Sequence, residues 1–311
     1  MRKAKFLVNI VCRLEVEMKR VAIVKTFMRP KVFKQCINAL IAAGTQEVLV
    51  AFDGPSEYWE PHKKIVFEAN QIIDVEIYRF PFDYGLAACR NRLIEMISEP
   101  YFLMLDDDII VIPGIWSALP IMTTSQKLAA ATFGWFYGGV LQIDAWDINI
   151  KNGEILTKTV RWPKQIVSIN GFTFYYPFDF VPNQGFWSRK FFNELRWDER
   201  YIIEGEHEDM AMQVFPTDWF FAVCTNIFLY HLHDWSEKEY HKHRFSEIKM
   251  SKSWMHFFQK WNLKEYRDGQ CLLPWLPLHL LKRVESTRES VAKCQRILGS
   301  ENKNQNFGKS M

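Results

Sequence analysis

The chain has 311 residues, of which 24% are charged and 48% hydrophobic, and a formal net charge of +3. This composition is typical of a folded protein long enough to bury a core, as one large domain or two small ones. The charge is too small to indicate a nucleic-acid partner, and no apolar run approaches the roughly 20 residues of a membrane span. Six scattered cysteines without a Cys-x-x-Cys pair favour buried thiols in a reducing compartment over disulfides or a zinc site.

The first elements alternate between strand and helix. Residues 1–20 carry apolar side chains at helical spacing, which predicts an amphipathic segment and not a signal peptide. Val21–Val24 is typical of a buried strand, and Pro30 is placed to begin a helix. Glu47–Phe52 predicts a second strand, which ends in the turn signal Asp53–Ser56.

Two further strands and a helix follow. Val75–Tyr78 predicts a strand, Gly85–Ile97 a helix, and the apolar run Tyr101–Ile112 a strand interrupted by three carboxylates. This alternation predicts an α/β fold with a mostly parallel central sheet and helices on both faces. Ligands bind beyond the carboxyl ends of such strands. The side chains expected to converge there are Thr26, Asp53, Asp83 and Asp106–Asp108.

The triplet Asp106, Asp107 and Asp108 is the most informative motif in the chain. Burying unpaired charge is costly, so these side chains must face solvent, a basic partner or a cation. Carboxylate oxygens suit Mg²⁺ or Mn²⁺, which usually complete their coordination with phosphate oxygens of a substrate. The alternative is a solvated acidic turn.

The order of the motifs resembles family 2-type glycosyltransferases, which adopt the Rossmann-like GT-A fold. Within that family the chain looks closest to the β-1,4-N-acetylgalactosaminyltransferase branch, the ganglioside-synthase type. The motifs that carry the resemblance are Thr26-x-x-Arg29-Pro30, Asp53-Gly54, Gly85-Leu-Ala-Ala-Cys-Arg-Asn91, Asp106–Asp108, Trp197-Asp-Glu-Arg200, Gly205-Glu-His-Glu-Asp-Met210 and His231-Leu-His233.

The resemblance implies three parts of the chain. Residues 1–20 precede a GT-A domain at 21–235, which divides into a nucleotide-sugar half (21–112) and an acceptor and catalytic half (113–235). Residues 236–311 form a helical C-terminal region rich in basic and aromatic side chains.

A UDP-sugar donor and a Mn²⁺ or Mg²⁺ ion also follow from the resemblance. Asp53 is expected to accept a hydrogen bond from the uracil imide, although an Asp here can instead cap its own turn. The other donor-binding candidates are Thr26, Arg29, Asp83, Arg90, Asp106 and Asp107. The metal candidates are Asp106, Asp108, His231 and His233. Arg90 and His231 each have a structural alternative to the binding role. Arg90 could be a solvated or paired arginine, and His231 could be a histidine that packs after a strand.

The catalytic base implied by the resemblance is Asp209, with Glu208 and Glu206 as further candidates. Such a carboxylate would take the proton from the acceptor hydroxyl in a single displacement that inverts the anomeric carbon. Alternatively, the acidic run stabilises the N-terminus of a helix at Met210–Phe215.

Two regions leave the acceptor open. The Gly- and Trp-rich stretch Ala129–Phe180 is either an acceptor-side surface or ordinary hairpin and core. The basic and aromatic residues of 250–285 indicate either peripheral membrane contact or helices packed on the catalytic domain. We therefore expect a cytoplasmic protein, with a peripheral position on the inner face of the membrane as the alternative.

The function predicted on these grounds is a metal-dependent inverting glycosyltransferase. It would move a hexose or N-acetylhexosamine from a UDP-sugar to a hydroxyl of a glycan or lipid-linked acceptor. A sugar nucleotidyltransferase is disfavoured because no Gly-rich phosphate loop follows the first strand. A non-catalytic sugar- or membrane-binding protein of the same fold is the third hypothesis.

Overall fold

The computed structural model describes residues 18–232 and 238–277 of the chain. His233 and the terminal segments 1–17 and 278–311 lie outside the described residues, so the predictions made for them stay predictions. The first half contains β1 (Val21–Thr26), α1 (Pro30–Ala42), β2 (Glu47–Phe52), η1 (Ser56–Tyr58), α2 (Trp59–Ala69), β3 (Asp74–Arg79), α3 (Leu86–Met96), β4 (Tyr101–Asp106), β5 (Ile109–Ile110) and η2 (Ile115–Thr123).

The second half is richer in strands. It contains β6 (Leu128–Tyr137), β7 (Val140–Ile143), β8 (Asp147–Lys151), β9 (Ile155–Thr159), β10 (Gln165–Ile169), β11 (Phe172–Phe178), β12 (Gly185–Ser188), η3 (Arg189–Asn193), α4 (Glu206–Val214), β13 (Phe220–His231), α5 (Lys238–Arg244), α6 (Glu247–Trp261), β14 (Glu265–Arg267) and β15 (Leu273–Pro277).

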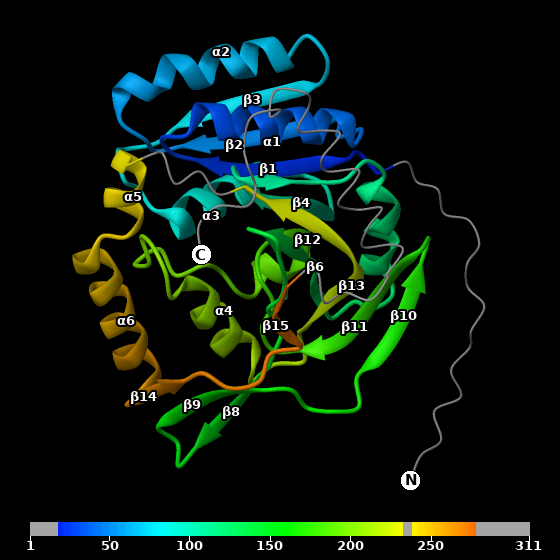
Figure 1. The fold of residues 1–311 in the computed structure, drawn as a ribbon, viewed down its shortest axis with the longest axis vertical. Coiled ribbons are helices and arrows are strands. Elements are labelled where there is room, and N and C mark those ends of the chain that lie inside the picture. The colour runs from blue at the N-terminus through cyan, green and yellow to red at the C-terminus, as the bar shows by residue number, and fades with distance from the viewer. Residues whose placement is uncertain (1–17, 233–237, 278–311) are drawn as a thin grey trace.

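One large mixed sheet organises the molecule (Figure 1). Its strands run in the order β10-β11-β13-β6-β12-β4-β1-β2-β3. The expected parallel arrangement holds for β3-β2-β1-β4, in which Val21 pairs with Glu47 and Glu47 with Asp74. The strand β12 pairs antiparallel with both β4 and β6, and thereby joins this parallel half to the second half.

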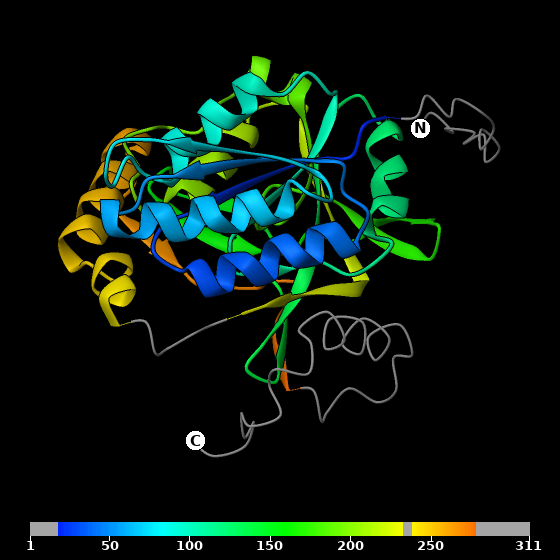
Figure 2. The ribbon, with the colours of Figure 1, turned by 90° about the horizontal axis from the view of Figure 1, so that it is seen from above.

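Helices cover both faces of the parallel half, as predicted (Figure 2). Successive side chains of a strand point to opposite faces. In β1, Ala22 and Val24 therefore pack against α1 and α2, whereas Val21 and Ile23 pack against α3. All four are fully buried. The sequence analysis did not predict α2.

The stretch Ala129–Phe180 contains most of β6 and all of β7 to β11. Its role toward an acceptor stays a prediction. Within β6, Phe133 and Phe136 are buried. The strand β9 pairs with β8 and β14 in a separate three-stranded sheet. The described part of the C-terminal region contains two helices, as expected, but also β15, which pairs with β7 in the large sheet.

One helix boundary, at the start of α4, differs from the prediction. The helix expected at Met210–Phe215 begins four residues earlier, at Glu206, after Gly205 in a left-handed conformation (φ 78°). Its first turn thus holds Glu206, Glu208 and Asp209, where carboxylates stabilise the helix dipole. Within residues 18–232 and 238–277, no helix is long and apolar enough to cross a membrane.

Candidate active site

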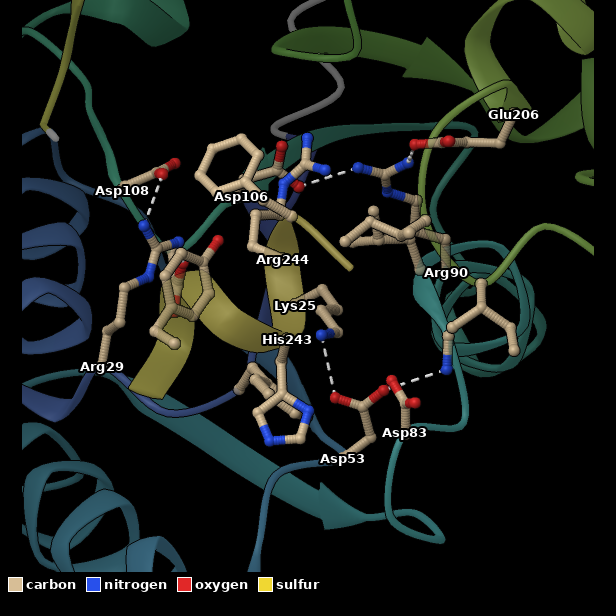
Figure 3. A pocket seen from close by; sticks show the side chains of 18 of the residues that line it. Lys25, Arg29, Asp53, Asp83, Arg90, Asp106, Asp108, Glu206, His243 and Arg244 are labelled. Carbon is tan, nitrogen blue, oxygen red and sulfur yellow. Dashed lines mark hydrogen bonds and ion pairs between the residues drawn. The ribbon is translucent and has the colours of Figure 1, made fainter. Parts of the chain in front are cut away.

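A cavity of about 200 Å³ lies beyond the carboxyl ends of β1, β2 and β4 (Figure 3). Four parts of the chain line it: the strand ends, the segment from Asp83 into α3, the residues that lead into α4 and begin it, and α5 with the residue after it. The residues predicted from sequence that line it are Arg29, Asp53, Asp83, Arg90, Asp106, Asp107, Asp108 and His231. The strand ends thus converge as the topology predicts.

Asp53 follows β2 and is held by two polar groups, Lys25 Nζ and the backbone N–H of Gly85. Its side chain is buried, lies 2.8 Å from Lys25 Nζ and accepts a hydrogen bond of 3.0 Å from the backbone N–H of Gly85. Burial lowers the pKa of Lys25, but the Asp53 carboxylate outweighs it, so that the pKa is raised. Lys25 and Gly85 therefore hold the Asp53 carboxylate at the cavity wall.

Two glycines, Gly54 and Gly85, allow the backbone around Asp53 to take this arrangement. A Cβ at Gly54 would lie 2.0 Å from the carbonyl oxygen of Phe27, so only glycine allows the two backbones to approach. Gly85 has φ 102°, a conformation that favours glycine, and it precedes α3. The motifs Asp53-Gly54 and Gly85-Leu86 are thus parts of one structure.

Arg90 connects Asp106 to the first turn of α4. Its guanidinium is buried and lies 2.8 Å from Asp106 Oδ1 and 3.4 Å from Glu206 Oε1. Gln184 donates a hydrogen bond of 3.1 Å to the other oxygen of Asp106. The Asp106 side chain, 27% exposed, is the most accessible of the triplet.

Arg29 neutralises the other two carboxylates. It contacts Asp107 and lies 2.8 Å from Asp108 Oδ2, while its guanidinium stacks 4.0 Å from the ring centre of Tyr240. Burial raises the pKa of Asp107, whereas for Asp108 the charges of Arg29 and His231 outweigh burial and lower the pKa.

Thr26 differs from the other predicted donor-binding residues. Its hydroxyl lies 2.7 Å from Asp107 Oδ2 and 3.0 Å from His62 Nε2, and it is buried behind the cavity wall. It does not line the cavity. Its position indicates that it orients Asp107.

His231, one of the two histidines predicted as metal ligands, lines the cavity together with Asp106 and Asp108. Its Nε2 lies 3.3 Å from Asp108 Oδ2, and Asp106 lines the same cavity. In residues 18–232 and 238–277 no group of three metal-ligating side chains is already assembled. The donor types nevertheless fit a hard divalent cation, since two carboxylates and an imidazole share one wall.

Asp209, the predicted base, lies away from the cavity. It is fully buried, and its carboxylate accepts hydrogen bonds from Lys260 at 2.9 Å, Trp261 at 2.8 Å and Gln213 at 2.7 Å. Lys260 and Trp261 come from α6, 51 and 52 residues further along the chain. Asp209 therefore anchors α6 to α4, which no local pattern could indicate.

Glu208 also does not line the cavity. Burial raises its pKa to about 7. The two residues of this turn that do line the cavity are Glu206 and His207. From the sequence, Glu206 was only a further candidate for the base, and His207 had no predicted role.

The segment that includes α5 supplies a wall that the sequence did not reveal. Tyr240, His243, Arg244 and Phe245 all line the cavity. His243 packs against both Phe27 and Phe82, with ring centres 5.6 Å from each. Asp83, at the rim, pairs with Lys249 of α6 at 2.5 Å. Residues 240–249 therefore form the wall of the cavity that faces the strand ends.

The comparisons with known proteins agree with this geometry. A family model described as glycosyl transferase family 2 matches residues 21–191. A structure of GalNAc-T7 with UDP, GalNAc and Mn²⁺ has a TM-score of 0.53 and 13% identity, covering 81% of this chain and 56% of that chain. Staphylococcus aureus TarS has a TM-score of 0.49 and 12% identity, covering 70% and 37%.

The chain thus spans less than two thirds of the length of either of these proteins. At 13% identity the likeness to GalNAc-T7 concerns the fold alone. No curated protein sequence matches the chain. The family model covers more than half of the 311 residues, including β1 to β4 and the Asp triplet, and the chain therefore belongs to glycosyl transferase family 2.

Proposed function

We propose that the protein transfers a hexose or an N-acetylhexosamine from a UDP-sugar to a hydroxyl of a glycan or lipid-linked acceptor. The observation that carries the proposal is the convergence of Asp53 and the Asp triplet on one cavity at the strand ends. A UDP-sugar needs a hydrogen-bond acceptor for the N–H of its uracil at one end of the site. It needs positive charge for its diphosphate at the other end.

The donor would bind with its uracil against Asp53, whose carboxylate is held by Lys25 and Gly85. Six further cationic or potentially cationic side chains line the cavity: Arg29, Arg90, His207, His231, His243 and Arg244. Their charges suit the diphosphate, which becomes more negative as it leaves. The cavity of about 200 Å³ is smaller than the roughly 300 Å³ at which pockets for drug-sized ligands begin, so α5 would move when the donor enters.

Asp106, Asp108 and His231 would hold a Mn²⁺ or Mg²⁺ ion, and His233 stays a further candidate outside the described residues. A bound ion would neutralise charge on the departing diphosphate. The site's own residues act beside it: Arg29 keeps Asp107 and Asp108 charge-paired, and Arg90 fixes the direction of Asp106.

Transfer would proceed by one displacement with inversion, and the proton acceptor would come from the first turn of α4. Asp209 was the candidate from sequence, but Lys260, Trp261 and Gln213 already engage its oxygens. Glu206 and His207 face the cavity instead, so we assign proton removal to this pair.

The acceptor and the cellular location stay predictions. Met255 and Lys252 are both exposed on α6, and this combination of an apolar and a basic side chain supports peripheral membrane contact within 250–285. The N-acetylgalactosaminyl branch is our finer proposal for the transferred sugar, and the GalNAc bound in GalNAc-T7 concerns that protein alone.

The proposal is tested by UDP release from a panel of UDP-sugars without an acceptor, with Mn²⁺ and then with a chelator. We expect slow, metal-dependent hydrolysis of one donor, which would also identify the sugar. Absence of hydrolysis, together with no thermal stabilisation by UDP and Mn²⁺, would favour the non-catalytic protein of the same fold. Release of diphosphate from a sugar phosphate and UTP would instead support the nucleotidyltransferase.

A further inference from the structure

His207 is a titratable side chain of the cavity wall. It is the second residue of α4 and lines the cavity beside Glu206, Arg90 and Asp106. Its ring lies between Trp197 and Phe180, with ring centres 6.1 and 6.3 Å away, and its side chain is 24% exposed. The ring is thus held in place yet remains accessible from the cavity.

One nitrogen of the ring is already engaged. His207 Nε2 lies 3.1 Å from Glu206 Oε1 and 2.9 Å from the side-chain amide of Asn183. With its amide oxygen toward the ring, Asn183 also accepts from the two terminal nitrogens of Arg90, at 2.6 and 2.7 Å. Glu206 Oε1 and this amide oxygen are both acceptors, so Nε2 carries a hydrogen, and the lone pair of the neutral ring lies on Nδ1.

Glu206 is the poorer proton acceptor of the two. Burial raises its pKa, but the charges of His207 and Arg90 outweigh burial and lower the pKa to about 2. Its Oε1 is shared by Arg90 and His207, and its Oε2 is buried without a hydrogen-bond partner. This geometry suits a carboxylate that orients an imidazole.

Resting on the function proposed above, we propose that His207 is the general base of the transfer, and that Glu206 is its positioning residue. The acceptor O–H gives its proton to His207 Nδ1 while the oxygen forms a bond to the anomeric carbon. The bond from that carbon to the β-phosphate oxygen breaks, and its electron pair leaves with UDP. The imidazolium formed is stabilised by the Glu206 carboxylate.

The charged groups around the ring set the pH at which this base works. Glu206 and Glu208 lie on its own helix, Arg90 faces it from α3, and Asp106 lies behind Arg90. Burial lowers the pKa of His207, but Glu206 outweighs it, so that the pKa is raised above the ordinary 6.5. The base is active when neutral, so activity should rise with pH through this raised pKa.

The test compares donor hydrolysis, with water as acceptor, from pH 5 to pH 9 in the wild type and three variants. In H207Q the rate at pH 8 should fall by about 10² or more and the rise with pH should disappear. In H207D, which restores a carboxylate, part of the rate should return and the rise should move below about pH 5. In E206Q the rise should shift toward lower pH, since the charge that raises the His207 pKa is gone.

Calorimetric titration with UDP runs in parallel, and H256Q serves as the matched control because His256 does not line the cavity. All three variants should bind UDP within about threefold of the wild type. An H207Q protein that binds UDP and keeps the wild-type rate and pH dependence overturns the assignment of the base alone. A wild-type protein that neither binds UDP nor hydrolyses any UDP-sugar overturns the proposed function together with the role of His207.

Discussion

The two sides of the cavity are built in different ways. On the donor side, Asp53 and Asp106–Asp108 follow strands β2 and β4, whose neighbours and register place them together. On the opposite side, the first turn of α4 carries three carboxylates, and contacts from α6 decide which of them faces the cavity. Sequence order therefore specifies the donor side, whereas long-range packing specifies the side that we assign to proton transfer.

The largest effect that this comparison predicts is at Asp108. Replacing Asp108 by Asn removes a charge shared by Arg29 and His231 and one of the proposed metal ligands. We expect the rate of metal-dependent donor hydrolysis to fall by about 10³-fold. The D268N variant is the matched control because the Asp268 side chain is 91% exposed. A D108N protein with unchanged metal dependence would show that Asp108 is not a ligand.

On the opposite side, Asp209 should matter for stability and not for chemistry. The D209N variant leaves Lys260 with Asp198 as its remaining carboxylate partner, and we expect the free energy of unfolding to fall by about 2 kcal/mol. Urea unfolding measures this loss. Donor hydrolysis by the folded protein should stay within about tenfold of the wild type. A loss of about 10² or more with normal UDP binding would restore Asp209 as the base.

The third prediction concerns the support behind the Asp triplet. Burial lowers the pKa of His62 to about 4, and its Nδ1–H donates to the carbonyl oxygen of Tyr58 at 2.7 Å. The unfolded chain, with an ordinary pKa of 6.5, takes up the proton first as the pH falls. Stability from neutral His62 is therefore complete above pH 6.5 and is lost progressively toward pH 4.

Urea unfolding at pH 7.5 and pH 5.0 measures whether the free energy of unfolding falls as the pH falls. The wild type should lose about 2 kcal/mol between the two values through His62 alone. In H62Q that part of the pH dependence should be absent, although the variant is less stable at pH 7.5. Equal losses in the two proteins would mean that His62 titrates normally in the fold.

The smallest predicted effect is the loss of UDP affinity when Asp53 is replaced. In D53N the amide still offers an oxygen to the nucleotide base but lacks the charge that Lys25 stabilises. We expect UDP affinity to fall by about tenfold, which corresponds to about 1.4 kcal/mol. D74N, on β3 with a side chain 56% exposed, is the control. An unchanged affinity would indicate that the uracil lies elsewhere in the cavity.

The parallel half of the fold could be predicted because its signals are local. Val21–Val24, Glu47–Phe52 and Val75–Tyr78 are short apolar or alternating runs, and each falls within an observed strand. The helix α2 was missed because its sequence follows a strong turn signal at Asp53–Ser56. The start of α4 was placed too late because Gly205 and the charged residues after it resemble a loop.

The site divides along the same line. Position after a strand predicted Asp53 and the Asp triplet, whereas the roles of Lys25, Gln184 and Tyr240 depend on contacts between distant parts of the chain. His207 had one usable signal, a titratable side chain between two carboxylates in the first turn of a helix. That signal could not say which side chain faces the cavity, since only the packing of α6 on Asp209 settles it.

The most direct test of the account is a calorimetric titration of UDP, with Mn²⁺ present, into the wild type, D53N and D209N. The account predicts equal affinity in the wild type and D209N, and weaker binding in D53N. No binding to the wild type, or a loss in D209N that matches the loss in D53N, would contradict the division of the cavity into a donor side at the strand ends and an opposite side at α4.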